Sequence, residues 1–192
     1  MQAGGGKRQE GARWGALPGA LDHRARGADL ALAVPTFGAL PEVPVSDHLA
    51  SVRWSRATPD FQYDTYDRAH TWRSGTGVEV PASAAVEFKG DPTRMNPEEG
   101  LVAALSSCHM LTFLAIAARK GLVVDRYEDD AVGVLEKEGG KLWVTRVTLR
   151  PRVVFGGAAP DAAALAHLHE QAHNNCFIAN SVKTQVTVEP AG

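Results

Sequence analysis

Residues 96–121 read NPEEGLVAALSSCHMLTFLAIAARKG, and this stretch decides the fold. Asn96 is a residue type that caps helices, and Pro97 suits the first helical position. Two glutamates follow, where negative charge complements the positive end of the helix dipole. Two basic residues precede Gly121, which supplies a stop. Since the residues between these ends are apolar on nearly every side, we predict a central helix that is buried all round.

One of only two cysteines, Cys108, lies at the middle of this predicted helix. A lone cysteine in an apolar helix is usually a small core residue. Here, however, Ser106, Ser107 and His109 interrupt the apolar run at the thiol. The second cysteine, Cys176, follows another predicted helix in a His-rich setting. These features favour a functional thiol.

The length of 192 residues predicts a single domain, and a hydrophobic content of 44% is enough for a core. A formal net charge of -2 gives no electrostatic reason to expect nucleic acid or an anionic membrane as a partner. Two cysteines do not make a disulfide scaffold, so we expect the cytoplasm. The apolar run 110–118 is far shorter than the roughly 20 residues of a membrane span, and no transmembrane helix is predicted.

Residues 1–45 are rich in Ala, Gly and Arg and show no sustained hydrophobic period. We interpret them as a disordered or non-native N-terminal extension. The folded domain is predicted to cover residues 46–190.

The remaining elements follow from alternation, turns and caps. Strands are predicted at 61–65, 66–72, 78–80 and 84–88, with a turn at 74–77. A hairpin is predicted from 131–135 and 141–150 across 138–140, and 152–155 extends it as an edge. Residues 122–124 are interpreted as a link, Asp161 as the cap of a second helix, and 181–188 as a last strand. The predicted class is α+β with mostly antiparallel sheets.

These motifs resemble the OsmC/Ohr family, the osmotically inducible protein C and organic hydroperoxide resistance proteins. The residues that carry the likeness are NPEE at 96–99, SCH at 107–109, AHNNC at 172–176 and the pair Ser181 and Val182. The likeness covers roughly residues 47 to 189. It implies antiparallel sheets around a long buried helix, in an intertwined homodimer.

The resemblance also implies a thiol peroxidase that acts on organic hydroperoxides without a metal, a flavin or another bound cofactor. Cys108 would attack the peroxide, and Cys176 would resolve the sulfenic acid as a disulfide. Glu98 would pair with an arginine that holds the attacking sulfur as thiolate. A dithiol such as a lipoyl group would then reduce the disulfide.

The chemistry of these residue types agrees with those roles. Only a thiolate attacks, and a free cysteine has a pKa of about 8.5, so a mid-helix thiol requires a nearby cation. Ten helical residues place Glu98 about 15 Å along the axis from Cys108. Antiparallel packing of two central helices would bring each glutamate to the other subunit's thiol, which favours a shared site. The alternative is that Glu98 only complements the helix dipole.

The arginine is harder to assign, because the chain lacks the Gly-Arg-Asp-Gly turn of the hydroperoxide-resistance branch. We select Arg73, at the end of a predicted strand, with Arg68 and Arg94 as alternatives. Phe177 stands where that branch usually has proline, and His109 where it tends to have an aromatic residue. The chain therefore resembles the broad OsmC-like group more than that branch.

A different class of function stays open. His169 and His173 share a helix face at i and i+4, and Cys176 is a further soft ligand for zinc. The alternative hypothesis is thus a non-catalytic protein of the same fold that binds a small molecule or a metal.

Overall fold

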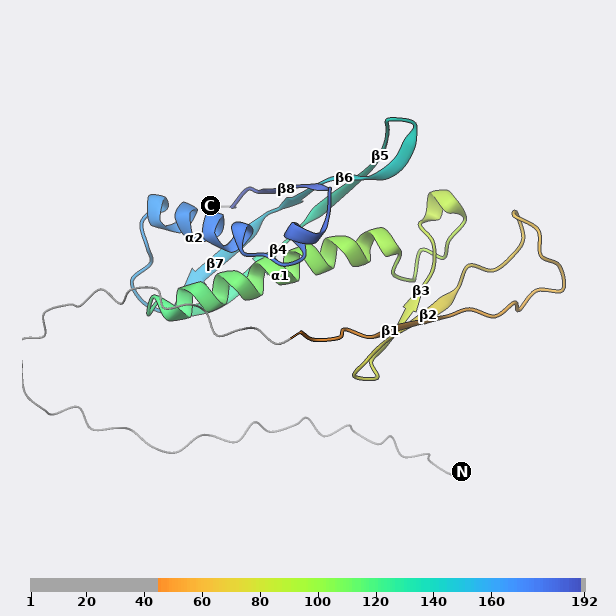
Figure 1. Cartoon of the computed structure of the whole chain (residues 1–192), viewed down its shortest axis with the longest axis horizontal. Helices are drawn as coiled ribbons and strands as arrows, with labels where there is room; N and C mark the ends of the chain where they lie inside the picture. The colour runs from red at the N-terminus through yellow and green to blue at the C-terminus, as the bar shows by residue number, and fades with distance from the viewer. Residues whose placement is uncertain (1–44, 191–192) are drawn as a thin grey trace, which may run out of the picture. The chain divides into compact units, whose positions relative to one another are not determined.

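The computed structural model describes residues 45–190 (Figure 1). Its elements are β1 (Ala50–Arg53), β2 (His70–Ser74), β3 (Glu79–Ala82), the 3₁₀ helix η1 (Val86–Phe88), α1 (Pro97–Arg119), β4 (Val124–Asp129), β5 (Val132–Glu138), β6 (Lys141–Leu149), β7 (Pro151–Phe155), α2 (Ala162–Asn174), the 3₁₀ helix η2 (Ala179–Ser181) and β8 (Gln185–Val188). The predicted α+β class is confirmed. The extension predicted for residues 1–45 lies outside the described residues, apart from Val45.

The ends of α1 are those that the sequence predicts. The Asn96 side chain accepts a hydrogen bond from the Glu99 amide at 2.8 Å, and the Glu99 carboxylate accepts one from the Asn96 amide at 3.0 Å. This reciprocal pair is a capping box. At the other end Gly121 has a φ of 72°, a left-handed conformation that glycine adopts without strain.

Only one face of α1 is buried within the chain. Leu105, His109, Phe113 and Ala117 recur every four residues and face the core. On the opposite side Leu111 is 60% exposed. The prediction of all-round burial is therefore wrong for a single chain. The reason is that α2 and the strands β4, β5 and β6 contact the helix from the same side (Figure 1).

By length and composition alone α1 also qualifies as a membrane span, since an 18-residue window in it has a mean hydropathy of 1.9. This corrects the expectation that no segment would qualify. That expectation rested on the uninterrupted run 110–118 and left out the apolar residues before Cys108. The core helix of a protein outside the membrane passes the same test.

Over α1 lies a three-stranded sheet in the order β5-β6-β8. The predicted β5–β6 hairpin is confirmed, and Gly139 and Gly140 both take the positive φ that its tight turn requires. β8 begins at Gln185, four residues later than predicted, and runs parallel to β6. Leu105, Val147 and Leu149 form the buried cluster between α1 and this sheet.

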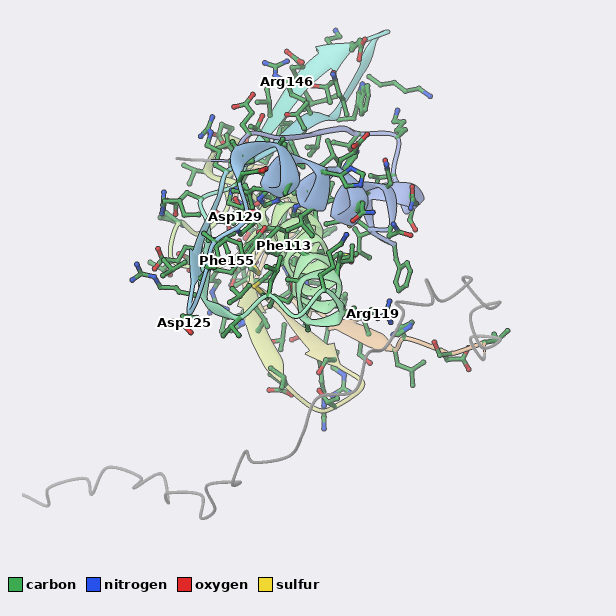
Figure 2. The ribbon with its side chains drawn as sticks, turned by 90° about the vertical axis from the view of Figure 1, so that its left-hand side faces the viewer. Phe113, Arg119, Asp125, Asp129, Arg146 and Phe155 are labelled. Carbon is green, nitrogen blue, oxygen red and sulfur yellow. The ribbon has the colours of Figure 1, made fainter. Side chains whose placement is uncertain are left out.

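A separate two-stranded sheet pairs β4 with β7 in antiparallel register. The prediction of a link at 122–124 missed β4, because the charged residues of this strand obscure the alternation of apolar and polar positions. The strand predicted at 152–155 exists as β7, but its partner is β4 and it does not extend the β5–β6 hairpin. A second buried cluster joins α1 to α2 through Phe113, Ala117, Leu168 and Ala172. Figure 2 shows Phe113 on the side of α1 that faces α2.

The N-terminal sheet has the order β1-β2-β3. The turn at 74–77 is confirmed, β1 was not foreseen, and the strand predicted at 84–88 is instead η1. The Trp72 indole of β2 packs against Gly100 of α1 so closely that a Cβ there would lie 2.9 Å from two ring atoms.

The strand predicted at 61–65 is also wrong. The alternating aromatic residues there pack on one another, with ring centroids of Phe61 and Tyr66 5.3 Å apart. The Arg68 guanidinium donates to the carbonyls of Tyr63 and Tyr66 at 2.6 and 2.9 Å. The chain therefore satisfies its polar groups as a loop, and β2 begins only at His70.

Candidate active site

The structure brings the two cysteines together, although they lie on different helices. Cys108 comes from the middle of α1 and is partly buried, and Cys176 follows the end of α2 and is 1% exposed. The Ile178 amide donates to the Cys108 sulfur at 3.5 Å, and the next amide, of Ala179, donates to the Cys176 sulfur at 3.4 Å. Both cysteines are free thiols. One short turn thus contacts both sulfurs.

The environment of Cys176 favours its protonated form. Burial raises its pKa to about 11, and the neighbouring Cys108 thiol acts in the same direction. The amides of Ala179 and Ile178 oppose this shift but do not cancel it. Near neutral pH this residue is therefore a thiol and not a thiolate.

Glu98 does not reach the thiols of its own chain. Its carboxylate lies in the first turn of α1, ten residues before Cys108, about 15 Å along a continuous helix. It lines an open groove of about 1230 Å³, which Cys108 does not line. Its Oε2 is buried and has no hydrogen-bond partner within residues 45–190. An unpaired buried carboxylate oxygen is costly, so this position calls for a donor.

The three candidate arginines are all apart from the thiols. Arg73 is exposed and lies 3.9 Å from Glu79 on the adjacent strand. Arg68 is buried against the rings of Tyr63 and Tyr66. Arg94 pairs with Asp91 at 3.2 Å and lines the groove that contains Glu98. In the described chain none of them donates a hydrogen bond to Cys108.

Sequence reasoning named His109 and His169 separately but missed that they form a buried pair. His109 Nε2 and His169 Nδ1 are hydrogen-bonded at 3.2 Å, and the two rings are nearly parallel, at 8°. Both side chains are buried, at 0% and 3% exposure. Burial lowers the pKa of each ring to about 4, so both are neutral near pH 7. The two residues are 60 positions apart, and no sequence pattern links them.

The predicted metal ligands do not assemble. His169 and His173 do line one small cavity, but within residues 45–190 no three His, Cys, Asp or Glu side chains are arranged to hold a metal. His169 Nδ1 is already bonded to His109, and the Cys176 sulfur accepts from an amide. The metal-binding form of the alternative hypothesis is therefore not supported by the geometry.

The groove around Glu98 has further polar groups. Ser106 of α1 donates to the Asp129 carboxylate at 2.5 Å, and the Arg150 amide donates to the other oxygen of Asp129 at 2.6 Å. The Tyr127 hydroxyl is buried there without a partner among the described residues. Burial raises the pKa of this tyrosine, so it stays protonated. The groove is thus largely apolar, with polar groups on α1, on β4 and in the loop that precedes α1.

Comparison with known proteins gives a consistent result. YmaD of Bacillus subtilis is 28% identical over 116 residues, which are 59% of this chain and 75% of YmaD. The solved structure of an OsmC-like protein from Vibrio cholerae is 46% identical, with a TM-score of 0.73, and the match covers 77% of this chain and all of that one.

The organic hydroperoxide resistance protein OhrB of Bacillus subtilis shares the fold at 17% identity, with a TM-score of 0.55 over 76% of this chain and 98% of its own. A family model described as OsmC-like protein matches residues 90–191, which include both thiols, Glu98 and the histidine pair. The chain belongs to the OsmC-like protein family.

Proposed function

We propose that the protein is a thiol peroxidase that reduces organic hydroperoxides. The observation that carries the proposal is the pair of adjacent free thiols in unlike environments, Cys108 partly accessible and Cys176 buried. Structural neighbours that include organic hydroperoxide resistance proteins support the same reaction class. The proposal assigns attack to Cys108 because it is the more accessible sulfur.

The chemistry takes three steps. The Cys108 thiolate attacks one peroxide oxygen, the O–O bond breaks, and the alcohol leaves with a proton, which gives a Cys108 sulfenic acid. The Cys176 thiol then loses its proton to the leaving hydroxyl as its sulfur attacks that of Cys108, which releases water and forms a disulfide. A dithiol donates two electrons and two protons, becomes oxidised itself and restores both thiols. Burial keeps Cys176 protonated, so it does not attack peroxide itself and remains available to react with the sulfenic acid of Cys108.

The proposal includes a homodimer with composite sites. The exposed apolar side of α1 needs a cover, and Glu98 needs a donor for its unpaired oxygen. Packing the α1 helices of two chains antiparallel would cover this side and set each Glu98 near the other chain's Cys108, with an arginine as the donor to Glu98. Arg94 is the candidate arginine that already shares the groove with Glu98, and like Arg73 it pairs with a carboxylate of its own chain. Replacing each of Arg73, Arg68 and Arg94 by methionine tests which one activates the thiol.

The test is consumption of an alkyl hydroperoxide with dihydrolipoamide as the electron donor. We expect turnover by the wild type, none above the dithiol blank by Cys108→Ser, and one slow turnover with over-oxidation by Cys176→Ser. Full activity of Cys108→Ser would refute the proposal. It would leave the groove of about 1230 Å³ as the basis for a small-molecule-binding protein without catalysis.

A mixed dimer tests the composite site. A chain with both Cys108→Ser and Glu98→Ala is combined with wild type and purified by a second tag. If the sites are composite, the remaining Cys108 faces a chain without Glu98, and activity falls well below half. Half activity would show that each subunit works alone.

A further inference from the structure

The buried histidine pair has no step in the proposed reaction, yet each ring lies close to a cysteine along the chain. His109 directly follows Cys108 on α1. His169 lies in α2, and Cys176 lies just beyond the end of that helix, seven residues after His169. Two hydrogen bonds tie this segment to the last turn of α2, because the Asn175 amide donates to the Gln171 carbonyl at 3.2 Å and the Cys176 amide to the His173 carbonyl at 3.1 Å. A rotation or slide of α2 therefore moves the Cys176 sulfur directly.

The contact between the rings fixes the register of the two helices. His109 Nε2 and His169 Nδ1 lie 3.2 Å apart. The Phe113 ring covers His169 with its centroid 4.5 Å away. The outer nitrogens, His109 Nδ1 and His169 Nε2, have no partner within residues 45–190. The mutual bond is thus the one polar contact that either ring makes in this part of the chain.

Apolar packing alone would fix this register less sharply. Leu168 and Ala172 of α2 pack on Phe113 and Ala117 of α1, and such contacts tolerate small shifts with modest losses. A shift of α2 by one residue would break the histidine bond and leave two more buried nitrogens unpaired. A hydrogen bond depends on direction, so breaking this one costs more free energy than slightly shifting one apolar contact.

We propose that the His109–His169 hydrogen bond is a positioning contact for disulfide formation, which locks α2 to α1 so that the Cys176 thiol stays beside the Cys108 thiol. The inference deepens the proposed function and rests on it for its biological meaning. Its test uses no hydroperoxide, so the two ideas fail separately.

The test measures the equilibrium of the two thiols with glutathione. One glutathione disulfide accepts two electrons and two protons from Cys108 and Cys176, which gives one protein disulfide and two glutathione molecules. The equilibrium constant reports how well the fold holds the two sulfurs together. The variants His109→Leu and His169→Leu remove the hydrogen bond at similar side-chain size. The matched control is His167→Leu, because His167 lies on the same helix, is exposed and bonds only Glu170, at 3.2 Å.

We expect both Leu variants to lower the equilibrium constant about tenfold or more, which corresponds to about 30 mV for this two-electron couple. The control should stay within about twofold of wild type, and His169→Asn, whose amide can replace Nδ1, should recover most of the loss. Leu variants that match the control would overturn the proposal.

If a Leu variant does not fold, His169→Asn and His109→Gln decide the question. Both retain a polar atom near the position of the lost ring nitrogen. Equilibrium constants within about threefold of wild type support the positioning role, and a tenfold loss in both refutes it.

Discussion

Acid should weaken the fold through the His109–His169 pair, in a defined pH window. In the unfolded chain each ring has a pKa near 6.5, and burial lowers it to about 4 in the fold. Between these values the unfolded chain binds more protons than the folded chain, so stability falls as the pH decreases from 6.5 toward 4. About one pH unit above 6.5 both states are neutral at these sites, and the pair no longer causes pH dependence.

The size of the effect follows from the same values. A pKa change from 6.5 to about 4 corresponds to about 3 kcal/mol for the first ring to be charged, at 1.36 kcal/mol per unit. The second proton costs more, because the two charges would be buried side by side. Other groups that act on the pair are His173, which opposes protonation of His109, and Asp129, which favours protonation of His169.

The assay is urea unfolding at pH 7, 6, 5 and 4.5, at one protein concentration. The reference is the double variant His109→Gln with His169→Asn, which retains hydrogen-bonding atoms but does not titrate. Carboxylates elsewhere contribute equally to both proteins and cancel in the difference. Because the unfolded chain binds a proton on each of the two rings in this range, we expect wild type to lose about 4 to 5 kcal/mol more than the variant between pH 7 and 4.5. Parallel stability curves would refute the assigned buried, neutral state of the pair.

Gly100→Ala should cost about 1 to 3 kcal/mol of unfolding free energy because its Cβ meets the β2 indole ring at 2.9 Å, whereas Gly157→Ala, with nothing within 4 Å, should be nearly neutral in the same denaturation assay. For the proposed dimer through α1, Leu111→Lys should raise the dissociation constant at least about 30-fold in a light-scattering dilution series, because two leucines that are 60% exposed in single chains would lose their cover; an unchanged constant would contradict this interface. Iodoacetamide at pH 7.5 should label Cys108 well before Cys176, whose pKa is about 11; mass spectrometry of partly labelled protein checks this, and the reverse order would contradict the assigned burial.

Local chemistry made part of this fold predictable. The cap at Asn96, the stop at Gly121 and the turn at Gly139 and Gly140 each depend on neighbouring residues, and the structure contains all of them. The failures are contacts over long distances. β4 is a strand because β7 pairs with it, and the 61–65 segment is a loop because its aromatic rings pack together.

The candidate site was also predictable only in part. The positions of Cys108, Cys176 and Glu98 follow from motifs that resemble a family, and their roles stay predictions. The His109–His169 bond could not be predicted, because it joins helices whose register is set only by packing. The burial of α1 was misjudged for a related reason. An apolar surface predicts that a helix is covered, but it does not indicate whether residues of the same chain cover it.

The parallel strand β8 has a consequence for the life of each new molecule. It is the last strand described, and it completes the sheet over α1 only after the turn that contacts both sulfurs. Cys108 precedes Cys176 in the chain, so the ribosome adds it first. Contacts between segments this far apart in the sequence form late in folding. Under the proposed chemistry, an oxidant that reaches a growing chain meets a thiol with no neighbour to trap its sulfenic acid. We expect irreversible oxidation of Cys108 to concentrate in newly synthesised protein.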